Sequence, residues 1–199
     1  MVRVEKLLVG TGNQSKLSHY RQYFEGTNIH LVGLADVGIS DEPEETGETF
    51  EENAVLKARF YCKKSGLPAL SDDAGFEIPA LGNFPGVKSN RFAGHKMSEQ
   101  EVIDGILKKM SGLQGEDRLA VMKVVVALAF PDGKTFVESG FIKGIVPEKP
   151  YPKTEIKFPY RSLLYLPTLE KWFYEISPQE EDQLGYRKSA VQKIKSHLT

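Results

Sequence analysis

The segment from Glu44 to Phe76 constrains the fold and the chemistry of this chain more than any other. Residues 46–65 show a helical pattern with acidic first turns and a basic last turn, as the helix dipole favours, and a glycine then ends the pattern. Residues 67–70 begin an apolar strand, which is followed directly by Asp72 and Asp73. The segment therefore predicts a helix followed by a strand whose end carries two carboxylates.

Strand and helix patterns alternate in the first part of the chain. In the later part, two strand patterns follow each other directly. Strands are predicted at residues 7–9, 29–33, 67–70, 119–130 and 135–146, the last two joined as a hairpin by residues 131–134. Helices are predicted after residues 10–13, at 46–65, at 98–110 with a capping box, and at 178–198 with a break near Gly185. Residues 147–167 contain five prolines and are expected to be irregular except near residues 163–166. A mixed α/β sheet is the expected architecture.

Composition limits the partners that such a chain would bind. The 199 residues fit a single domain with either one lobe or two. The chain has 26 basic and 27 acidic residues, which give a net charge of −1. This balance gives no reason to expect a long nucleic acid or an anionic membrane as partner. The single cysteine, Cys62, excludes an internal disulfide and indicates a reducing compartment. No apolar run approaches the roughly 18 residues of a membrane span, so we expect a cytoplasmic protein.

The turn from Thr11 to Lys16 follows the first predicted strand and opens a helix. Such a turn directs free backbone N–H groups and the helix N-terminus at whatever lies above the strand, an arrangement that suits phosphate. The GxxxxGK[ST] spacing of a P-loop is absent. Taken alone, a Gly-Asn turn that caps a helix is commonplace, so phosphate binding here depends on the other motifs.

The adjacent residues Asp72 and Asp73 are a more specific signal. Two neighbouring carboxylates are costly to bring together unless a cation neutralises them. The alternative is an exposed Asp-Asp-x-Gly turn, but apolar residues on both sides favour a site. Mg2+ prefers a few carboxylates plus phosphate oxygens, and Glu44 or Glu45 would supply a second carboxylate.

Lys57 lies one helical turn after Asn53 and would face the same site, although a solvated lysine is the usual alternative on a helix. The four histidines form no set with a serine or cysteine that would indicate covalent catalysis; they are His19, His30, His95 and His197.

The N-terminal half of the chain resembles the inosine triphosphate pyrophosphatase family, which hydrolyses deaminated purine nucleoside triphosphates such as ITP, dITP and XTP to the monophosphate and pyrophosphate. Several separate motifs in the family's order carry the resemblance. They are Thr11-Gly12-Asn13 with Lys16, Glu44-Glu45-Thr46-Gly47 with Thr49-Phe50, Glu52-Asn53-Ala54 with Leu56-Lys57-Ala58, Leu67-Pro68-Ala69 with Asp72-Asp73 and Gly75, and then Leu81-Gly82, Pro85-Gly86, Ser89, Arg91 and Gly94.

The resemblance implies an elongated α/β fold with a long, mixed, twisted sheet flanked by helices, two lobes with a cleft between them in a single domain over residues 1–199, dependence on Mg2+, and a homodimer. It implies that Asp73 is the general base that activates water, that Glu44 and Asp73 bind the metal, and that Glu45 and Asp72 are further candidates for this role. The residues implied in holding the nucleoside triphosphate are Thr11, Gly12, Asn13, Lys16, Lys57, Ala74 and Arg91.

The C-terminal half departs from the family pattern in the segment that reads the base. Residues 157–162 keep the aromatics but lack the family's glycines, Asp and Pro, and Arg161 stands where the family has the Asp. Glu181 and Tyr186 stand where the family has Lys and His, and only the following arginine is kept. The candidate substrate contacts in this half are Phe158, Tyr160, Arg161, Tyr186 and Arg187.

These replacements change hydrogen-bonding polarity, so we expect that hydrolysis is retained while base selection differs. Two alternatives stay open: neighbouring side chains restore the usual preference, or the correspondence in this proline-rich region is displaced by a few residues.

The sequence thus predicts a Mg2+-dependent nucleoside triphosphate pyrophosphatase that cleans the nucleotide pool. An alternative is a nucleotide-binding or regulatory protein that kept the fold but has reduced or lost turnover. A structural dimer without a ligand fits the Asp72-Asp73 pair and Lys57 least well.

Overall fold

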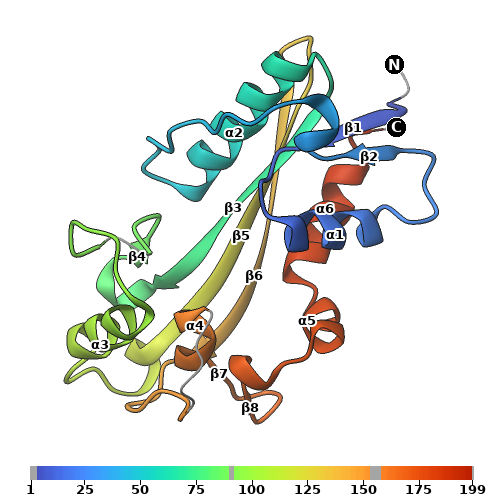
Figure 1. The fold of residues 1–199 in the computed structure, drawn as a ribbon. Helices are drawn as coiled ribbons and strands as arrows, with labels where there is room; N and C mark the ends of the chain where they lie inside the picture. The colour runs from blue at the N-terminus through green and yellow to red at the C-terminus, as the bar shows by residue number, and fades with distance from the viewer. Residues whose placement is uncertain (1–3, 90–91, 153–157, 199) are drawn as a thin grey trace. The chain divides into compact units, whose positions relative to one another are not determined.

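The structure is a computed structural model, and it describes residues 4–89, 92–152 and 158–198. The described residues contain one sheet of eight strands in the order β2-β1-β3-β5-β6-β7-β8, with β4 paired to β3 (Figure 1). The strands are β1 Lys6–Val9, β2 His30–Val32, β3 Ala69–Ile78, β4 Phe84–Gly86, β5 Leu119–Ala129, β6 Thr135–Ile145, β7 Tyr165–Leu166 and β8 Lys171–Trp172. The helices are α1 Gln14–Tyr23, α2 Phe50–Ser65, α3 Glu99–Lys109, α4 Pro159–Leu163, α5 Pro178–Leu184 and α6 Tyr186–Lys195.

The sheet is mixed, as the sequence predicted. Strand β1 pairs in parallel with β2 and with β3, because the helical crossovers α1 and α2 bring the chain back in the same direction. The pairs β3 with β4, β6 with β7, and β7 with β8 are antiparallel. The family-like α/β fold with a sheet flanked by helices is therefore confirmed.

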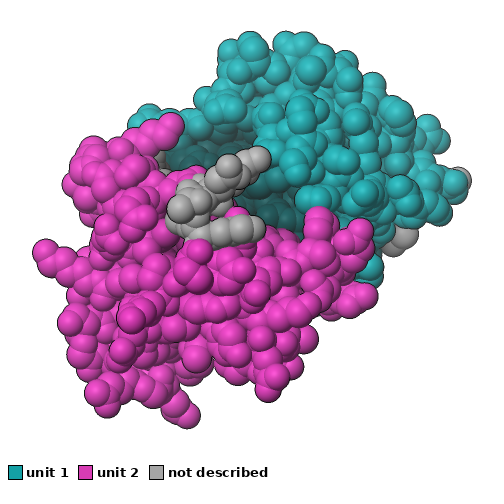
Figure 2. All heavy atoms as spheres, turned by 60° about the horizontal axis from the view of Figure 1, so that its bottom comes forward, with its two compact units in different colours: residues 1–74, 124–140, 185–199 teal, residues 75–123, 141–184 magenta. Residues whose placement is uncertain are grey.

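Two compact units divide the chain (Figure 2). Unit 1 comprises residues 1–74, 124–140 and 185–199, and unit 2 comprises residues 75–123 and 141–184. Strands β3, β5 and β6 contribute residues to both units. The cleft between two lobes that the resemblance implies stays a prediction.

Unit 1 is layered. Helix α2 lies on one face of its strands, and helices α1 and α6, which contact each other, lie on the other face (Figure 1). Its core includes the buried side chains of Leu7, Leu8, Tyr20, Ala54 and Leu70. In unit 2, α4 packs against α3, and buried side chains from both helices, including Ile103, Ile106, Tyr160 and Leu163, fill the core.

Local sequence signals explain most element boundaries. Helix α2 begins at Phe50, because Thr49 and Glu52 form a capping box, and it ends at Gly66 in the left-handed conformation. The predicted capping box of α3, Ser98 with Glu101, is confirmed. The break near Gly185 is also confirmed, since this residue has a φ of 72° between α5 and α6.

Three expectations about the elements are wrong. Helix α2 starts four residues later than the predicted residue 46, because the cap is Thr49. Strand β3 continues to Ile78, so Asp72 and Asp73 lie within the strand and not after its end. The region of residues 147–167 contains helix α4, which was not expected, because Pro159 occupies the first turn of this helix, where a missing N–H group costs nothing. Strand β7 falls within residues 163–166, where regular structure was expected.

None of the helices that the structure describes combines the length and the apolar character needed to cross a membrane.

Candidate active site

Asp72 and Asp73 are consecutive residues of β3, and the pleat of the strand directs their side chains to opposite faces. Asp72 contacts Lys16 of α1 and Arg187 of α6, whereas Asp73 contacts Lys57 of α2. Cationic side chains therefore neutralise both carboxylates, and the metal ion predicted at this pair stays a prediction. Each carboxylate has basic partners of its own on its own face of the strand.

The Asp72 carboxylate is the centre of a buried ion cluster. Its side chain is 2% exposed, Lys16 Nζ lies 3.2 Å from Oδ1, and the Arg187 guanidinium donates to Oδ2. Burial alone would raise the pKa of Asp72, but the positive charges of Lys16 and Arg187 outweigh it and hold that pKa well below its usual range. Tyr20 lies fully buried beside this cluster, and burial followed by the charge of Asp72 raises its pKa. Asp72 is therefore ionised and held by cations, which favours a structural role.

Two glycines allow the backbone to bring Arg187 into contact with Asp72. Gly185 adopts a left-handed conformation that ends α5 and begins α6 two residues before Arg187. A Cβ atom on Gly140 of β6 would lie 1.8 Å from the carbonyl oxygen of Tyr186, so only glycine permits this close approach. Tyr186, a predicted substrate contact, is itself buried at this position.

On the other face of the strand, Asp73, Lys57 and Glu45 form a row in which negative and positive charges alternate. Lys57 Nζ lies 3.4 Å from Asp73 Oδ1 and 2.6 Å from Glu45 Oε1. Burial raises the pKa of Asp73, the charge of Glu45 adds to this rise, and Lys57 and a hydrogen bond from Asn53 oppose it, with a net rise. The backbone N–H of Ala74 also donates to Asp73 Oδ1 at 3.1 Å. Asp73 is thus a positioned carboxylate with a raised proton affinity.

Asn53 connects the loop that carries Glu45 to Asp73. Its buried side-chain oxygen accepts a hydrogen bond from the Gly47 N–H at 2.8 Å, and its side chain also bonds to Asp73. A Cβ atom on Gly47 would lie 2.6 Å from this oxygen, so glycine lets the loop approach. The sequence placed Asn53 one turn before Lys57, but it did not indicate these two bonds.

Glu45 and Asp73 are the two carboxylates at this site of the kind that a divalent metal takes as ligands. Both carboxylates surround the same ammonium group of Lys57, which shows that they converge on one positive charge. In the parts of the chain that the structure describes, no three His, Cys, Asp or Glu side chains form a group that could hold a metal. Mg2+ needs only one or two carboxylates when substrate phosphates and water complete its shell, so these residues fit it. Glu44 is exposed, and Glu45 is the residue of this pair that contacts Lys57.

The Thr11–Lys16 turn is organised mainly by its own side chains. The side-chain oxygen of Asn13 accepts hydrogen bonds from the N–H groups of Ser15 and Lys16 at 2.9 and 3.2 Å. Thr11 accepts one from the N–H of Asn13 at 3.2 Å. The expectation of free N–H groups is therefore wrong for these three amides. Lys16 nevertheless extends its ammonium group to β3, where it meets Asp72.

Unit 2 contains the remaining predicted substrate contacts. Phe158 is 37% exposed, whereas Tyr160 is fully buried, stacks on Phe76 at 4.8 Å between ring centroids, and donates its hydroxyl to the carbonyl of Ser89 at 2.5 Å. Phe158 packs edge-on against Tyr160 at 5.5 Å. The buried position of Tyr160 favours a role in supporting Phe158 over direct contact with a substrate. Arg91 lies outside the described residues.

Arg161 is held by other residues of unit 2. One terminal nitrogen lies 2.6 Å from Glu181 Oε2, and the other donates to the carbonyl of Ile176 at 2.8 Å. The guanidinium also lies over the ring of Phe173, 4.2 Å from its centroid. Arg161 and Glu181, two of the residues that depart from the family pattern, therefore contact each other.

Comparison with known proteins places these residues in a family. The model of the Ham1 family matches residues 7–197. The chain belongs to the Ham1 family. The dITP/XTP pyrophosphatase of Bacillus subtilis is 30% identical over 198 residues, which cover 100% of this chain and 99% of that protein. A dITP/XTP pyrophosphatase of Thermus thermophilus is 37% identical over 194 residues, which cover 98% of this chain and 92% of that protein.

Solved structures of Ham1 proteins agree with this assignment. The Staphylococcus aureus Ham1 protein has a TM-score of 0.85 at 30% identity, and the match covers 97% of each chain. The HAM1 protein of Coxiella burnetii has a TM-score of 0.86 at 31% identity and covers 97% of this chain and 98% of that one. The family resemblance and the fold predicted from the motifs are confirmed.

Proposed function

We propose that this Ham1 chain is a nucleoside triphosphate pyrophosphatase that hydrolyses deaminated purine nucleotides to the monophosphate and pyrophosphate, and so cleans the nucleotide pool. Full-length relatives named dITP/XTP pyrophosphatase support the reaction class. The observation that carries the proposal is the position of Asp73, which is half-buried, has a raised pKa, and lies beside the ammonium group of Lys57.

Asp73 is the residue proposed to take the proton from the attacking water. A carboxylate whose pKa is raised by burial is a stronger base than one with the usual pKa. Lys57 and Asn53 hold it in one orientation from α2, so the base is positioned before the substrate arrives. Ala74 adds a third contact through its backbone N–H.

The lysines are proposed to neutralise the charge that develops on the leaving pyrophosphate. Lys57 and Lys16 both reach β3, and each is partly exposed and can therefore exchange its carboxylate partner for a phosphate oxygen. Charge neutralisation and positioning supply most of the catalysis in phosphoryl-group chemistry, which needs no covalent intermediate. Thr11, Gly12 and Asn13 shape the turn that holds Lys16.

We propose Glu45 and Asp73 as the residues that hold Mg2+, with Glu44 as a further candidate ligand from the same loop. The ion would polarise the phosphoryl group and screen the charge of the triphosphate. Asn53 contributes by fixing the distance between the loop and Asp73, through its bonds to Gly47 and to the carboxylate.

Base selection is proposed to follow that of the named relatives, with Phe158 as the exposed ring that stacks on the base. An altered preference is the second candidate, because the chain has Tyr186 where the family has His. The contact of Arg161 with Glu181 argues against Arg161 as the source of a new preference. A homodimer and a cytoplasmic location remain predictions from the family resemblance, and light scattering after gel filtration tests the first.

Pyrophosphate release tests the proposal. The purified chain is assayed with ITP, dITP, XTP, GTP, dUTP and the common triphosphates, with Mg2+ and again with EDTA, beside the Asp73→Asn variant. We expect turnover that favours ITP and XTP, requires the metal and is lost in the variant. Nucleotide binding without metal-dependent release of pyrophosphate from any substrate would favour the binding protein instead.

A further inference from the structure

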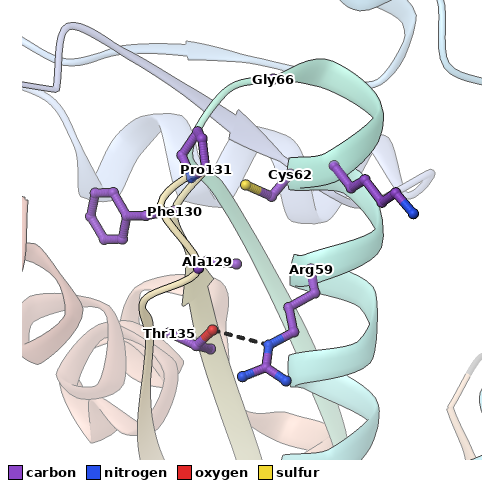
Figure 3. Close-up of a pocket in the computed structure, with 9 residues that line it drawn as sticks. Arg59, Cys62, Gly66, Ala129, Phe130, Pro131 and Thr135 are labelled. Carbon is purple, nitrogen blue, oxygen red and sulfur yellow. Dashed lines mark hydrogen bonds between the residues drawn. The ribbon is translucent and has the colours of Figure 1, made fainter.

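A pocket of about 450 Å³ lies in unit 1 between α2 and the hairpin that joins β5 to β6 (Figure 3). Its lining comes from residues 59–66 on the helix and residues 129–135 on the hairpin. The volume falls within the range of about 300–1,000 Å³ that is usual for small-molecule sites. The size and the lining therefore suit a small ligand.

This pocket is distinct from the candidate active site. Asn53 and Lys57 point from α2 toward Asp73, whereas Arg59 and Cys62, which line the pocket, project from the helix on nearly the opposite side at 3.6 residues per turn. A molecule in the pocket would therefore contact α2 without touching Asp73.

Arg59 is held in an orientation that suits an anion. Its side chain reaches across the pocket, and Nε donates to Thr135 Oγ1 at 3.1 Å (Figure 3). Neither terminal nitrogen of this guanidinium has a partner among the described residues. Because a guanidinium fixed through Nε presents its two terminal N–H groups as a fork, it can bind a phosphate or carboxylate through two hydrogen bonds.

A second cation and an apolar wall complete the pocket. Lys63 lies one helical turn after Arg59 and has no acidic partner in the described part of the chain. Pro131 and Ala129 line the opposite side, and the sulfur of Cys62 points into the space between the helix and the hairpin, whereas the ring of Phe130 points away from α2 (Figure 3). The pocket thus combines positive charge with apolar surface.

The acidic residue of the hairpin turn, Asp132, is already neutralised. Asp132 lies close enough to Cys62 to affect it electrostatically. Its carboxylate is bound by the ammonium group of Lys134 at 2.9 Å and by the backbone N–H of Lys134 at 3.0 Å. The unpaired charges at the pocket are therefore, among the residues that the structure describes, those of Arg59 and Lys63.

We propose that this pocket is a second ligand site, which binds a small molecule that carries a phosphate or carboxylate group on an apolar body. The anionic group would lie on Arg59 and Lys63, and the body would lie against Cys62, Ala129 and Pro131. The proposal goes beyond the proposed function and does not depend on turnover.

Cys62, the only cysteine of the chain, lines the pocket and is 4% exposed, so its slow alkylation reports local access to the pocket. Alkylation of Cys62 by iodoacetamide is followed by intact mass, with phenyl phosphate, benzoate, inosine monophosphate or inorganic phosphate present at millimolar concentrations. We expect at least one of the organic anions to slow alkylation about threefold or more. The same ligand should also slow the alkylation of Cys62 in the Asp73→Asn variant. Protection in that variant would show that the pocket binds the ligand independently of catalysis. Shifts of the thermal unfolding midpoint by the same ligands decide the proposal in the same way where Cys62 does not react.

Two variants decide whether the effect arises in the pocket. Arg59→Met should abolish the protection, whereas Lys64→Met, which removes a neighbouring charge of α2 that is paired with Asp41, should retain it. No protection by any organic anion, or equal protection in Arg59→Met, would overturn the proposal. Equal protection by inorganic phosphate alone would overturn the part assigned to the apolar wall.

Discussion

Asp72 and Asp73 are adjacent in sequence, yet their carboxylates lie on opposite faces of strand β3 and bind different cations. Asp72 is fixed between Lys16 and Arg187, and Asp73 lies beside Lys57 with a raised pKa. One strand therefore supplies a buried ion cluster that ties α1 and α6 to the sheet, and a second carboxylate, the proposed base, that faces α2. We propose separate roles for the two acids, and single substitutions should distinguish them.

Replacement of Asp72 by Asn should lower the stability of the fold. The change leaves the buried Arg187 guanidinium without its counter-charge, and breaking a buried ion pair costs about 3–5 kcal/mol. Urea unfolding followed by circular dichroism measures the free energy of unfolding. Asp132→Asn on an exposed turn is the matched control, and we expect little or no change in stability there. Equal effects of the two substitutions would show that the Asp72 cluster is not structural.

Replacement of Asp73 by Asn should abolish most turnover and leave the fold intact. Removing a general base lowers kcat by about 100- to 10,000-fold, because the amide cannot accept the proton of the attacking water. The measurement is pyrophosphate release at saturating ITP, with circular dichroism as the check on folding. Asp36→Asn serves as the control, since Asp36 is exposed on the η1 turn of residues 35–37 and its carboxylate contacts Arg21 and the N–H of Gly33. A kcat within threefold of the parent enzyme would remove Asp73 from the mechanism.

The sequence predicted the elements around this site because their signals are local. The capping box of Ser98 with Glu101 and the break at Gly185 mark helix ends within a few residues, so α3 and the boundary between α5 and α6 could be located from the sequence alone. The sequence also placed Asp73 and Lys57 together through the family motifs. The length of β3 was missed, because polar residues within a strand resemble a turn unless their partners on both faces are known.

Contacts between distant segments were not predictable from local patterns. The ion pair of Asp72 with Arg187 joins residues 115 positions apart, and the sequence carries no periodic signal for it. The same holds for the bond of Asn53 to Gly47, which depends on how the loop before α2 folds back onto the helix. Arg161 was predicted to face the base, and its contact with Glu181 emerged only from the packing of unit 2.

Replacement of Asn53 by Ala should lower kcat and shift the pH dependence of the reaction. The variant leaves the Gly47 N–H unpaired, at a cost of about 1–3 kcal/mol, and loosens the loop that carries Glu45. The bond from Asn53 lowers the pKa of Asp73, so its loss should raise that pKa and move the acidic limb of the kcat profile to higher pH. Kinetics between pH 5 and 9 measure the shift, with Glu51→Ala on the same helix as control. An unchanged acidic limb would contradict the positioning role.

Glu180 should make the stability of the chain depend on pH in the acidic range. Hydrogen bonds from Lys171 and from the backbone N–H of Ser177 lower the pKa of Glu180 to about 2. Because the folded pKa is depressed, the contribution of Glu180 is present above its unfolded pKa of about 4.3 and is lost as the pH falls toward 2. Glu180→Gln should therefore be less stable than the parent at pH 7, and the urea midpoints should converge as the pH falls below about 4. A constant difference from pH 7 to pH 3 would contradict this assignment.

Arg161 and Glu181 should behave as one coupled pair in a charge-swap experiment. Arg161→Asp places two acids together and Glu181→Lys places two bases together, whereas the double variant restores opposite charges. We expect the double variant to be more stable than the sum of the two single changes predicts, by about 0.5–3 kcal/mol, measured by urea unfolding. Glu180→Gln combined with Arg161→Asp is the control pair, since Glu180 binds Lys171 and should add without coupling. If Arg161 is a packing residue held over Phe173, the ratio of kcat/KM for ITP to that for GTP should stay within about threefold in the double variant. A shift of tenfold or more in that ratio would instead place Arg161 at the base, and would make the departure from the family pattern a change in specificity.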